Sequence, residues 1–122
     1  MIYHITERSN WAKAQATGLY SAPSLESEGF IHCSAIDQIL PVANSMFRGE
    51  RNLLVLCIDE SKLGARVLWE APMHPKPSAK PPATDDLLFP HVYGPIAVAA
   101  VKKAVDLAEG DSGFELPAEL PR

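Results

Sequence analysis

The sequence predicts one α+β domain over residues 1–122, built from short strands and two helices. Three patterns carry this prediction. The segment Leu53–Asp59 is apolar on both faces, which is typical of a strand in the middle of a sheet. Ile2–Thr6 and Arg66–Glu70 alternate in character, as half-buried strands do. Two further segments carry apolar residues at helical spacing.

The first helix is expected from about Glu7 to Thr17. Trp11 and Ala14 lie one turn apart and give it a modest apolar stripe. The hydroxyl of Thr6 is placed to cap its first turn, and Gly18 is the expected stop.

The second helix is expected to begin after Ser34-Ala35-Ile36-Asp37, which resembles a shortened capping box, and to end at Gly49. Its apolar stripe recurs at intervals of four, three and four residues, at Ile36, Leu40, Ala43 and Phe47. Pro41 has no backbone N–H, so it either kinks this helix or lies in the first turn of a new one.

Two stretches are expected to be loops. Tyr20–Ser27 is rich in serine and proline, and Ala71–Pro90 holds six of the eleven prolines of the chain. Long loops inside a compact domain often act as lids or binding loops.

The C-terminal part is ambiguous. Ile96–Ala108 slightly favours a helix by composition, although its valines also suit a turn followed by a short strand. The tail at 110–117 indicates a tight turn that leads to an edge segment.

Composition and charge exclude several classes of protein. A formal net charge of −4 with scattered Lys and Arg argues against a nucleic-acid interface, which needs clustered basic residues, although an RNA end stays open as a substrate. The N-terminus lacks the pattern of a secretory signal, and no apolar run approaches the roughly 20 residues of a membrane span. We therefore expect a cytoplasmic protein without membrane contact. Cys33 and Cys57 lie in apolar runs and are expected to be reduced packing residues.

The segment Glu28–Ser34 presents a histidine, a cysteine and a serine in consecutive positions. On an extended chain, His32 and Ser34 share one face with Phe30, whereas Cys33 points the other way. Adjacent Cys33 and His32 therefore cannot act as nucleophile and base. The stretch Phe89–Pro95 has a similar character, with His91 and Tyr93 on one face.

The histidines His4, His32 and His91 have two interpretations. Each could be a core histidine bonded to backbone carbonyls, or together they could line a polar cleft for ligand binding and acid–base chemistry. Their occurrence beside Ser34 and Tyr93 favours the cleft. Zinc is not expected, because the sequence lacks the short His-x-x-x-His spacing that holds two ligands locally.

Other candidates are less specific. Glu70 ends a predicted strand, where it could orient a ribose or act as a general base, or simply meet water. Asn44 and Arg48 lie one helical turn apart, where they could face a phosphate or solvent. Tyr93 could stack on a ligand ring or pack in the core, and Gly94 beside it is assigned to the same site.

These segments together resemble a small bacterial and plant family, domain of unknown function family 952. The resemblance covers nearly the whole chain and is most specific at Gly-Phe-Ile-His-Cys-Ser (residues 29–34) and Pro-His-Val-Tyr-Gly-Pro (residues 90–95). It implies a compact relative of the ADP-ribosyltransferase fold, with a split, mainly antiparallel β-sheet, two helices and NAD bound between the half-sheets. It also favours a turn and a strand over a helix at 96–107.

By this resemblance, the chain is expected to be an ADP-ribosyl or phosphoribosyl-type transferase that acts on NAD or an ADP-ribosyl-like nucleotide. His4 corresponds to the histidine that contacts the adenosine ribose. The catalytic candidates are Glu70, His32 and His91, and the ligand-binding candidates are His4, Ser34, Asn44, Tyr93 and Gly94. Such transferases usually carry a late catalytic glutamate, and none stands around Tyr93–Pro95. A non-catalytic nucleotide-binding or small-molecule-binding module is therefore the alternative.

Overall fold

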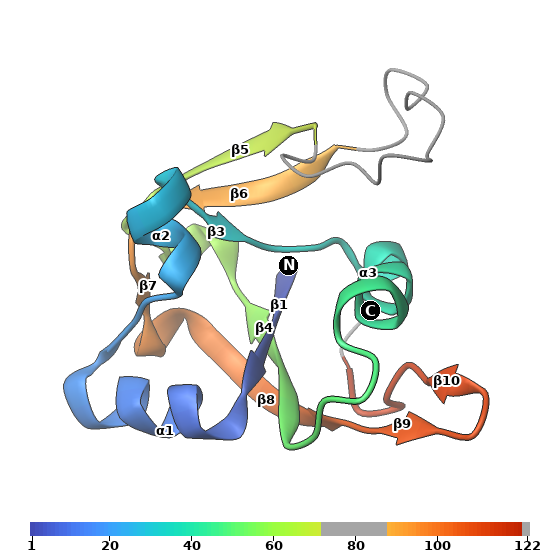
Figure 1. Ribbon diagram of the computed structural model, residues 1–122. Coiled ribbons are helices and arrows are strands. Elements are labelled where there is room, and N and C mark those ends of the chain that lie inside the picture. The colour runs from blue at the N-terminus through green and yellow to red at the C-terminus, as the bar shows by residue number, and fades with distance from the viewer. Residues whose placement is uncertain (72–87, 121–122) are drawn as a thin grey trace.

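The computed structural model describes residues 1–71 and 88–120. Its central element is β4 (Leu53–Ile58), which pairs antiparallel with β1 (Ile2–Glu7) on one side and β8 (Val101–Leu107) on the other (Figure 1). All six residues of β4 are buried. A strand covered on both faces cannot place polar side chains on either one, so the prediction of a central apolar strand is confirmed.

The side chains on the two faces of β4 pack into two separate hydrophobic cores. Leu54, Leu56 and Ile58 pack into a first core beside α1 (Arg8–Thr17), whose buried residues are Trp11 and Ala14. Leu53, Val55 and Cys57 pack into a second core beside α3 (Ile39–Met46). The alternation of strand side chains is the reason why consecutive residues enter different cores.

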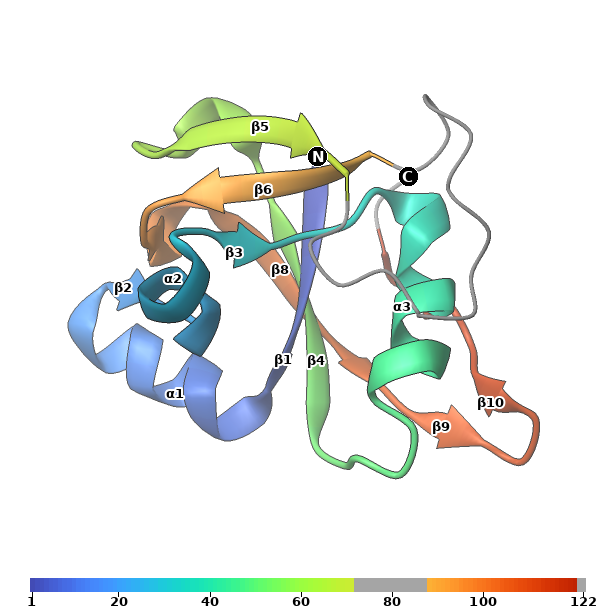
Figure 2. The ribbon, with the colours of Figure 1, turned by 45° about the horizontal axis from the view of Figure 1, so that its top comes forward.

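A second three-stranded sheet lies across one end of β1 and β4 (Figure 2). It has the order β3-β6-β5 and consists of β3 (Ile31–His32), β6 (Phe89–Tyr93) and β5 (Arg66–Glu70). Tyr3 and Ser34 link the two sheets by exchanging backbone hydrogen bonds of 2.8 and 2.7 Å. The described strands pair antiparallel throughout, so the fold is α+β with several small antiparallel sheets. A likeness to ADP-ribosyltransferases stays a prediction.

The first predicted helix is confirmed, but its predicted cap is wrong. Helix α1 ends at Gly18, whose left-handed φ of 88° disfavours residues with a side chain. No side chain caps the N-terminus, because Thr6 belongs to β1 and its hydroxyl contacts Tyr20 instead. The Thr6 hydroxyl is hydrogen-bonded to Tyr20 in the interior and is therefore not available to cap the helix.

The second predicted helix is present in two pieces. A 3₁₀ turn, η1 (Ile36–Gln38), precedes α3, so Pro41 lies in the first turn of a new helix. Helix α3 ends at Met46 rather than near Gly49. The predicted cap at Ser34 is wrong, because Gln38 accepts the backbone N–H of Ala35 at 2.8 Å and closes the turn.

The predicted loop at Tyr20–Ser27 is wrong. It contains the end of β2 (Leu19–Tyr20) and most of a short helix, α2 (Pro23–Glu28). Pro23 occupies the first turn of α2, where proline is favoured because its missing N–H is not needed. The predicted loop at Ala71–Pro90 lies mostly outside the described residues, and its last two residues belong to β6.

The helix favoured by composition at Ile96–Ala108 is also wrong, and the turn and strand implied by the resemblance are present. The segment forms β7 (Ile96–Ala97), the 3₁₀ turn η3 (Val98–Ala100) and β8. In β8, Val105 and Leu107 both point into the second core, as alternate residues of a strand do. A run this short does not distinguish the spacing of a strand from that of a helix, which explains the wrong prediction. The predicted tight turn follows as a hairpin of β9 (Glu109–Gly110) and β10 (Gly113–Phe114).

A further 3₁₀ turn, η2 (Glu60–Lys62), follows β4 and is capped by Asp59. Within the described residues, no helix has the length and apolar character needed to cross a bilayer.

Truncating Leu56 to alanine should lower the free energy of unfolding by about 2–5 kcal/mol, because the side chain is fully buried between two strands. Lys13→Ala on the exposed side of α1 is the matched control and should change it by less than about 0.5 kcal/mol. Urea unfolding of both variants measures the difference. Equal losses would contradict the central position of β4.

Candidate functional site

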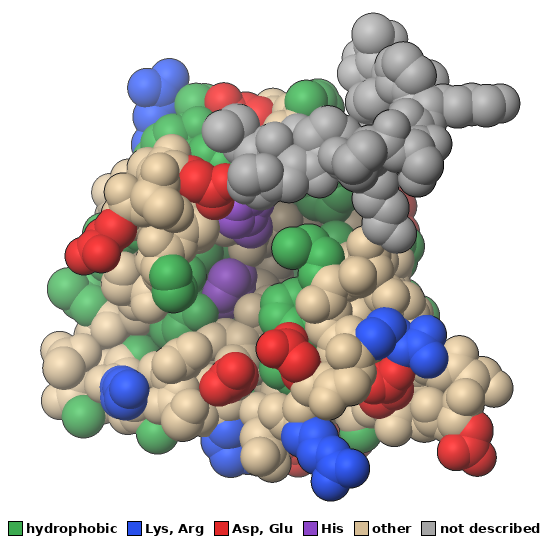
Figure 3. All heavy atoms as spheres, in the orientation of Figure 1, with side chains coloured by type: hydrophobic (Ala, Val, Ile, Leu, Met, Phe, Trp, Pro, Cys, Tyr) green, Lys and Arg blue, Asp and Glu red, His purple; other side chains and the backbone are tan. Residues whose placement is uncertain are grey.

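A cavity of about 250 Å³ opens between α2, α3 and the strands β1, β3 and β6. Figure 3 shows it as a hollow in which histidine side chains are visible. Its walls combine apolar side chains with three histidines and two serines: His4, Ile5, Ser24, His32, Cys33, Ser34, Val42, Met46, Phe47, Phe89 and His91. Four predicted site residues, His4, His32, Ser34 and His91, therefore lie around one cavity.

Pairing between β3 and β6 places the two central histidines side by side. His32 lies directly opposite His91, so both side chains project from the same face of the sheet, with ring centroids 5.3 Å apart. Phe30 stacks on His91 with a centroid distance of 4.0 Å and an interplanar angle of 16°. This stacking fixes the plane of the His91 ring.

Glu70 holds the other edge of His91. Its Oε1 accepts hydrogen bonds from Nδ1 of His91 at 2.9 Å and from the Tyr93 hydroxyl at 2.5 Å. The hydrogen bonds from Tyr93 and then His91 lower the pKa of Glu70, and the same carboxylate raises the pKa of Tyr93. Glu70, His91 and Tyr93, predicted separately, thus form one hydrogen-bonded group.

His91 carries an unused nitrogen. The residue is only 1% exposed. Because a carboxylate accepts hydrogen bonds, Nδ1 carries the hydrogen, and in the neutral ring Nε2 is then a lone-pair acceptor. Nε2 is buried and has no hydrogen-bond partner among the described residues. A buried polar atom without a partner destabilises a fold, so Nε2 of His91 is a candidate contact for a bound group.

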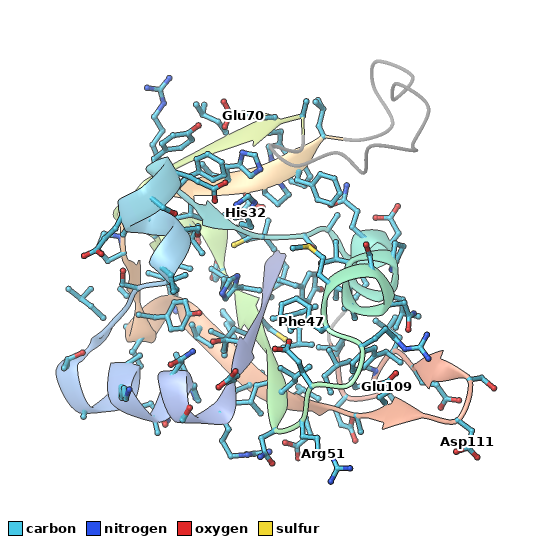
Figure 4. All side chains as sticks on the ribbon, viewed as in Figure 1. His32, Phe47, Arg51, Glu70, Glu109 and Asp111 are labelled. Carbon is cyan, nitrogen blue, oxygen red and sulfur yellow. The ribbon has the colours of Figure 1, made fainter. Side chains whose placement is uncertain are left out.

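His32 is the more accessible of the pair, with a side chain 40% exposed. Its Nε2 lies 2.7 Å from a carboxylate oxygen of Glu28, the last residue of α2. Figure 4 shows His32 and Glu70 in the same half of the molecule, on the β3-β6-β5 sheet. The site therefore contains two carboxylate–histidine pairs, one buried and one nearer to solvent.

His4 lines the cavity, but both of its ring nitrogens bind protein groups. Nδ1 donates to the backbone carbonyl of His32 at 2.6 Å, which leaves Nε2 as an acceptor for the Tyr20 hydroxyl at 2.7 Å. The Tyr20 oxygen also lies 2.8 Å from the hydroxyl of Thr6. Burial lowers the pKa of His4 to about 4 and raises the pKa of Tyr20 to about 12, so both are uncharged at neutral pH.

Both cysteines are free and buried, as predicted. Cys33 packs with Ile31 in the first core and touches the cavity, and burial raises the pKa of its thiol well above the usual range. Burial also raises the pKa of Cys57 to about 11. Both side chains are therefore neutral thiols at pH 7 and poor nucleophiles.

Besides Tyr93, which contacts Glu70, two predicted ligand-binding residues do not line the cavity. Asn44, on α3, accepts the backbone N–H of Phe114 at 2.9 Å and so holds the C-terminal hairpin. Gly94 packs against Ala65, where an added Cβ would come within 2.9 Å of the Ala65 Cβ. Neither lines the cavity, and both have a packing explanation.

Sequence reasoning missed Glu28, Phe30 and Tyr20 as parts of the site. Glu28 stands four residues before His32, a spacing that could have suggested the pair. Phe30 shares the strand face of His32, but its stacking on His91 depends on strand pairing. The contact of Tyr20 with His4 gives no sequence signal because it joins distant elements.

No three His, Cys, Asp or Glu side chains in the described parts of the chain come close enough to hold a metal ion. His4, His32 and His91 therefore do not assemble into the three-histidine ligand set considered for zinc.

The fold and cavity define a small α+β protein with a histidine-lined pocket. Residues 5–104 match the model of the family described as protein of unknown function (DUF952), and the chain belongs to that family. No curated protein shows a significant match.

Solved structures of one protein, CC0527 from Caulobacter crescentus, share the fold. Its crystal structure is 32% identical, covers 93% of this chain and 90% of its own, and has a TM-score of 0.75. A double mutant of CC0527 has a TM-score of 0.74 at the same identity and coverage. The solution NMR structure has a TM-score of 0.71 at 32% identity, with 93% and 89% coverage.

Acid should destabilise the fold through His4. Its folded pKa of about 4 lies below the unfolded value of 6.5, so the unfolded state binds more protons between these values and stability falls as pH drops. By pH 4 the free energy of unfolding should fall about 3 kcal/mol further in the natural protein than in His4→Asn, which cannot titrate. Urea unfolding at several pH values from 7 to 4 measures how the free energy of unfolding of each protein depends on pH. The same dependence in both proteins would contradict a buried neutral His4.

Asn44→Ala should lower the free energy of unfolding by about 1–2 kcal/mol, because the Phe114 N–H loses its acceptor. Asn44→Asp retains an oxygen at this position and should recover most of the loss. Affinity for any cavity ligand should be unchanged in both variants. Weaker ligand binding by a stably folded Asn44→Ala protein would show that Asn44 contacts the ligand after all.

Proposed function

We propose that the chain binds a small nucleotide-like or ring-bearing ligand in the cavity and that the Glu70–His91 pair performs acid–base chemistry on it. The observation that carries this proposal is the buried, unpartnered Nε2 of His91, whose Nδ1 is held by a carboxylate. Perturbed or unsatisfied titratable groups beside a cavity are concentrated at functional sites.

Each member of the group has a distinct part in this chemistry. Glu70 fixes the tautomer and orientation of His91, as the orienting carboxylate of a catalytic triad does. Nε2 of His91 is then a general base that takes a proton from an O–H or N–H of the ligand. As that proton moves, positive charge develops on the ring, and the ionised Glu70 stabilises it. His32 with Glu28 is positioned to supply a second proton-transfer group.

An ADP-ribosyl or phosphoribosyl-type reaction is the narrower form of this proposal. The family resemblance supports it, and NAD is then the substrate to test first. A whole dinucleotide does not fit within the described walls, since 250 Å³ lies below the roughly 300–1,000 Å³ of typical ligand pockets. No Lys or Arg among the described lining residues faces a pyrophosphate either. The cavity is therefore proposed to accept one end of such a molecule.

A non-catalytic binding module is the second candidate. The walls are largely apolar, and both ring nitrogens of His4 are hydrogen-bonded to protein groups. A cavity of this kind retains a ligand without needing to transform it.

Two assays separate these candidates. Thermal shifts with NAD, ADP-ribose and RNA carrying a 2′-phosphorylated end report binding, because a ligand that binds only the folded state raises its melting temperature. Release of nicotinamide from NAD reports turnover. Turnover supports the enzyme, and binding without turnover supports the binding module. The absence of both binding and turnover would contradict the proposal.

If turnover is found, His91→Asn should lower its rate about 100-fold or more, because asparagine can replace Nδ1 towards Glu70 but has no counterpart of Nε2. Glu70→Gln retains the hydrogen-bond acceptor and removes its charge, so a smaller loss is expected. Arg51→Ala is the control, since Figure 4 shows Arg51 at the opposite end of the molecule. Steady-state rates check all three, and full activity in His91→Asn would exclude His91 as the base.

A further inference from the structure

Strand β5 forms the outer edge of the β3-β6-β5 sheet. Figure 2 shows β6 between β5 and β3, and β6 is the only described strand that pairs with β5. No other described backbone group hydrogen-bonds to residues 66–70. Among the described residues, the backbone groups on the far side of β5 are therefore unpaired, and an edge of this kind can add a further strand.

The pairing of β5 with β6 shows which residues of β5 point outward. Pro90 has no N–H, and its carbonyl accepts the backbone N–H of Cys33 on β3 at 3.0 Å. The backbone of Pro90 therefore faces β3, and its antiparallel partner Trp69 faces away from β6. Val67 stands two residues earlier and points the same way. The outer edge of β5 thus offers the N–H and C=O groups of Val67 and Trp69.

Strand β5 lacks the features that keep exposed strand edges apart. Residues 66–70, Arg-Val-Leu-Trp-Glu, include no proline or lysine, and their ladder with β6 has no bulge. Trp69 is 45% exposed. By contrast, β8 at the edge of the other three-stranded sheet carries Lys102 and Lys103, and lysine discourages edge pairing. Of these two edges, β5 is the one suited to association.

The sequence of β5 is complementary to itself when two copies run antiparallel. Pairing Val67 with Trp69 of a second copy lets both outward-facing residues exchange hydrogen bonds, and Leu68 then lies opposite its own copy. In the same register, Arg66 lies opposite Glu70 of the second copy, so opposite charges meet at both ends. A shift by two residues would separate these charges.

Every cross-strand pair in this register is favourable. On one face, the valine and the tryptophan form a β-branched–aromatic pair, which is among the stabilising neighbours in sheets. On the other face, the guanidinium of Arg66 meets a carboxylate whose Oε1 accepts both of its described hydrogen bonds, so Oε2 is left for the second copy. Charge complementarity therefore selects a second copy of this chain as the occupant of the edge.

We infer that β5 pairs antiparallel with β5 of a second copy about a twofold axis at Leu68. The contact joins the β3-β6-β5 sheets of two chains into one continuous sheet. Five residues a side make a small interface, so the dimer forms with micromolar affinity. It also brings Arg66 of one chain beside the carboxylate that holds His91 in the other. The inference does not depend on the proposed function.

Sedimentation equilibrium of the full chain from micromolar to millimolar concentration tests the dimer. Arg66→Glu sets like charges opposite each other at both ends and should weaken dimerisation about tenfold or more, whereas Arg66→Lys should retain it. Arg51→Glu makes the same charge change at the opposite end of the molecule (Figure 4) and should leave dimerisation within about twofold of the natural protein. Arg66 is exposed, so these variants should fold, and their melting temperatures establish this.

A disulfide tests the register. Residue 68 and its copy form a pair without hydrogen bonds, whose Cα atoms lie about 4.5 Å apart, within reach of a disulfide. Leu68→Cys should therefore form a covalent dimer under mild oxidation, seen on a non-reducing gel. Arg66→Cys should not, because residue 66 and its copy lie about 13 Å apart in this register. Cys33 and Cys57 are buried and do not interfere.

A natural protein that stays monomeric at millimolar concentration overturns the inference. A dimer that Arg66→Glu does not weaken lies on another surface and overturns it as well. If Arg66→Cys links as readily as Leu68→Cys when both are dimeric by sedimentation, the register is wrong.

Discussion

The hydrogen bond from His4 to the backbone carbonyl of His32 joins the two three-stranded sheets at the point where the cavity forms. His4 belongs to β1 and His32 to β3, and the adjacent backbone bonds between Tyr3 and Ser34 reinforce the same junction. The bond requires a hydrogen on Nδ1 of His4, and the Tyr20 hydroxyl then meets the other nitrogen. A neutral imidazole can be buried here because both of its nitrogens are satisfied.

The geometry of the catalytic candidates depends on this junction. Strand β3 has only two residues in its ladder with β6, too few to fix its position alone. Anchored to β1 through its backbone, β3 presents His32 towards the cavity, opposite His91. A residue that was expected to hold a ligand thus also has a structural role, because His4 helps to shape the cavity through the position of β3.

Local chemistry explains which parts of the fold were predictable. The uninterrupted apolar run of β4 and the glycine after α1 are signals that need no knowledge of distant contacts. The errors arose where two local signals coincide. Pro23 was interpreted as a loop residue although proline also begins helices, and the valines of β8 satisfy helical and strand spacing alike.

The candidate site shows the same division. Strand alternation predicted His32 and Ser34 on the cavity side, and both line the cavity, but so does Cys33, because the strand β3 ends at His32 and strict alternation does not continue beyond it. It could not reveal that Glu70 binds His91, because the pair depends on how β5 and β6 align. The bond between Asn44 and the C-terminal hairpin was not predictable for a related reason, since helical spacing gives the face of a residue but not the hairpin that packs there.

Glu70 and His91 differ in their exposure to solvent, and this gives them different properties. Glu70 lies at the exposed end of β5 and stays ionised, because water and two donated hydrogen bonds stabilise its charge. His91 is enclosed, so solvent does not compete for its free nitrogen. A leucine or phenylalanine at position 91 would fill the same space without an unsatisfied atom, whose burial costs about 1–3 kcal/mol. Glu70 on one side and Phe30 on its face therefore fix the orientation of a ring whose second nitrogen is buried without a partner among the described residues, and this is the arrangement on which the proposed function rests.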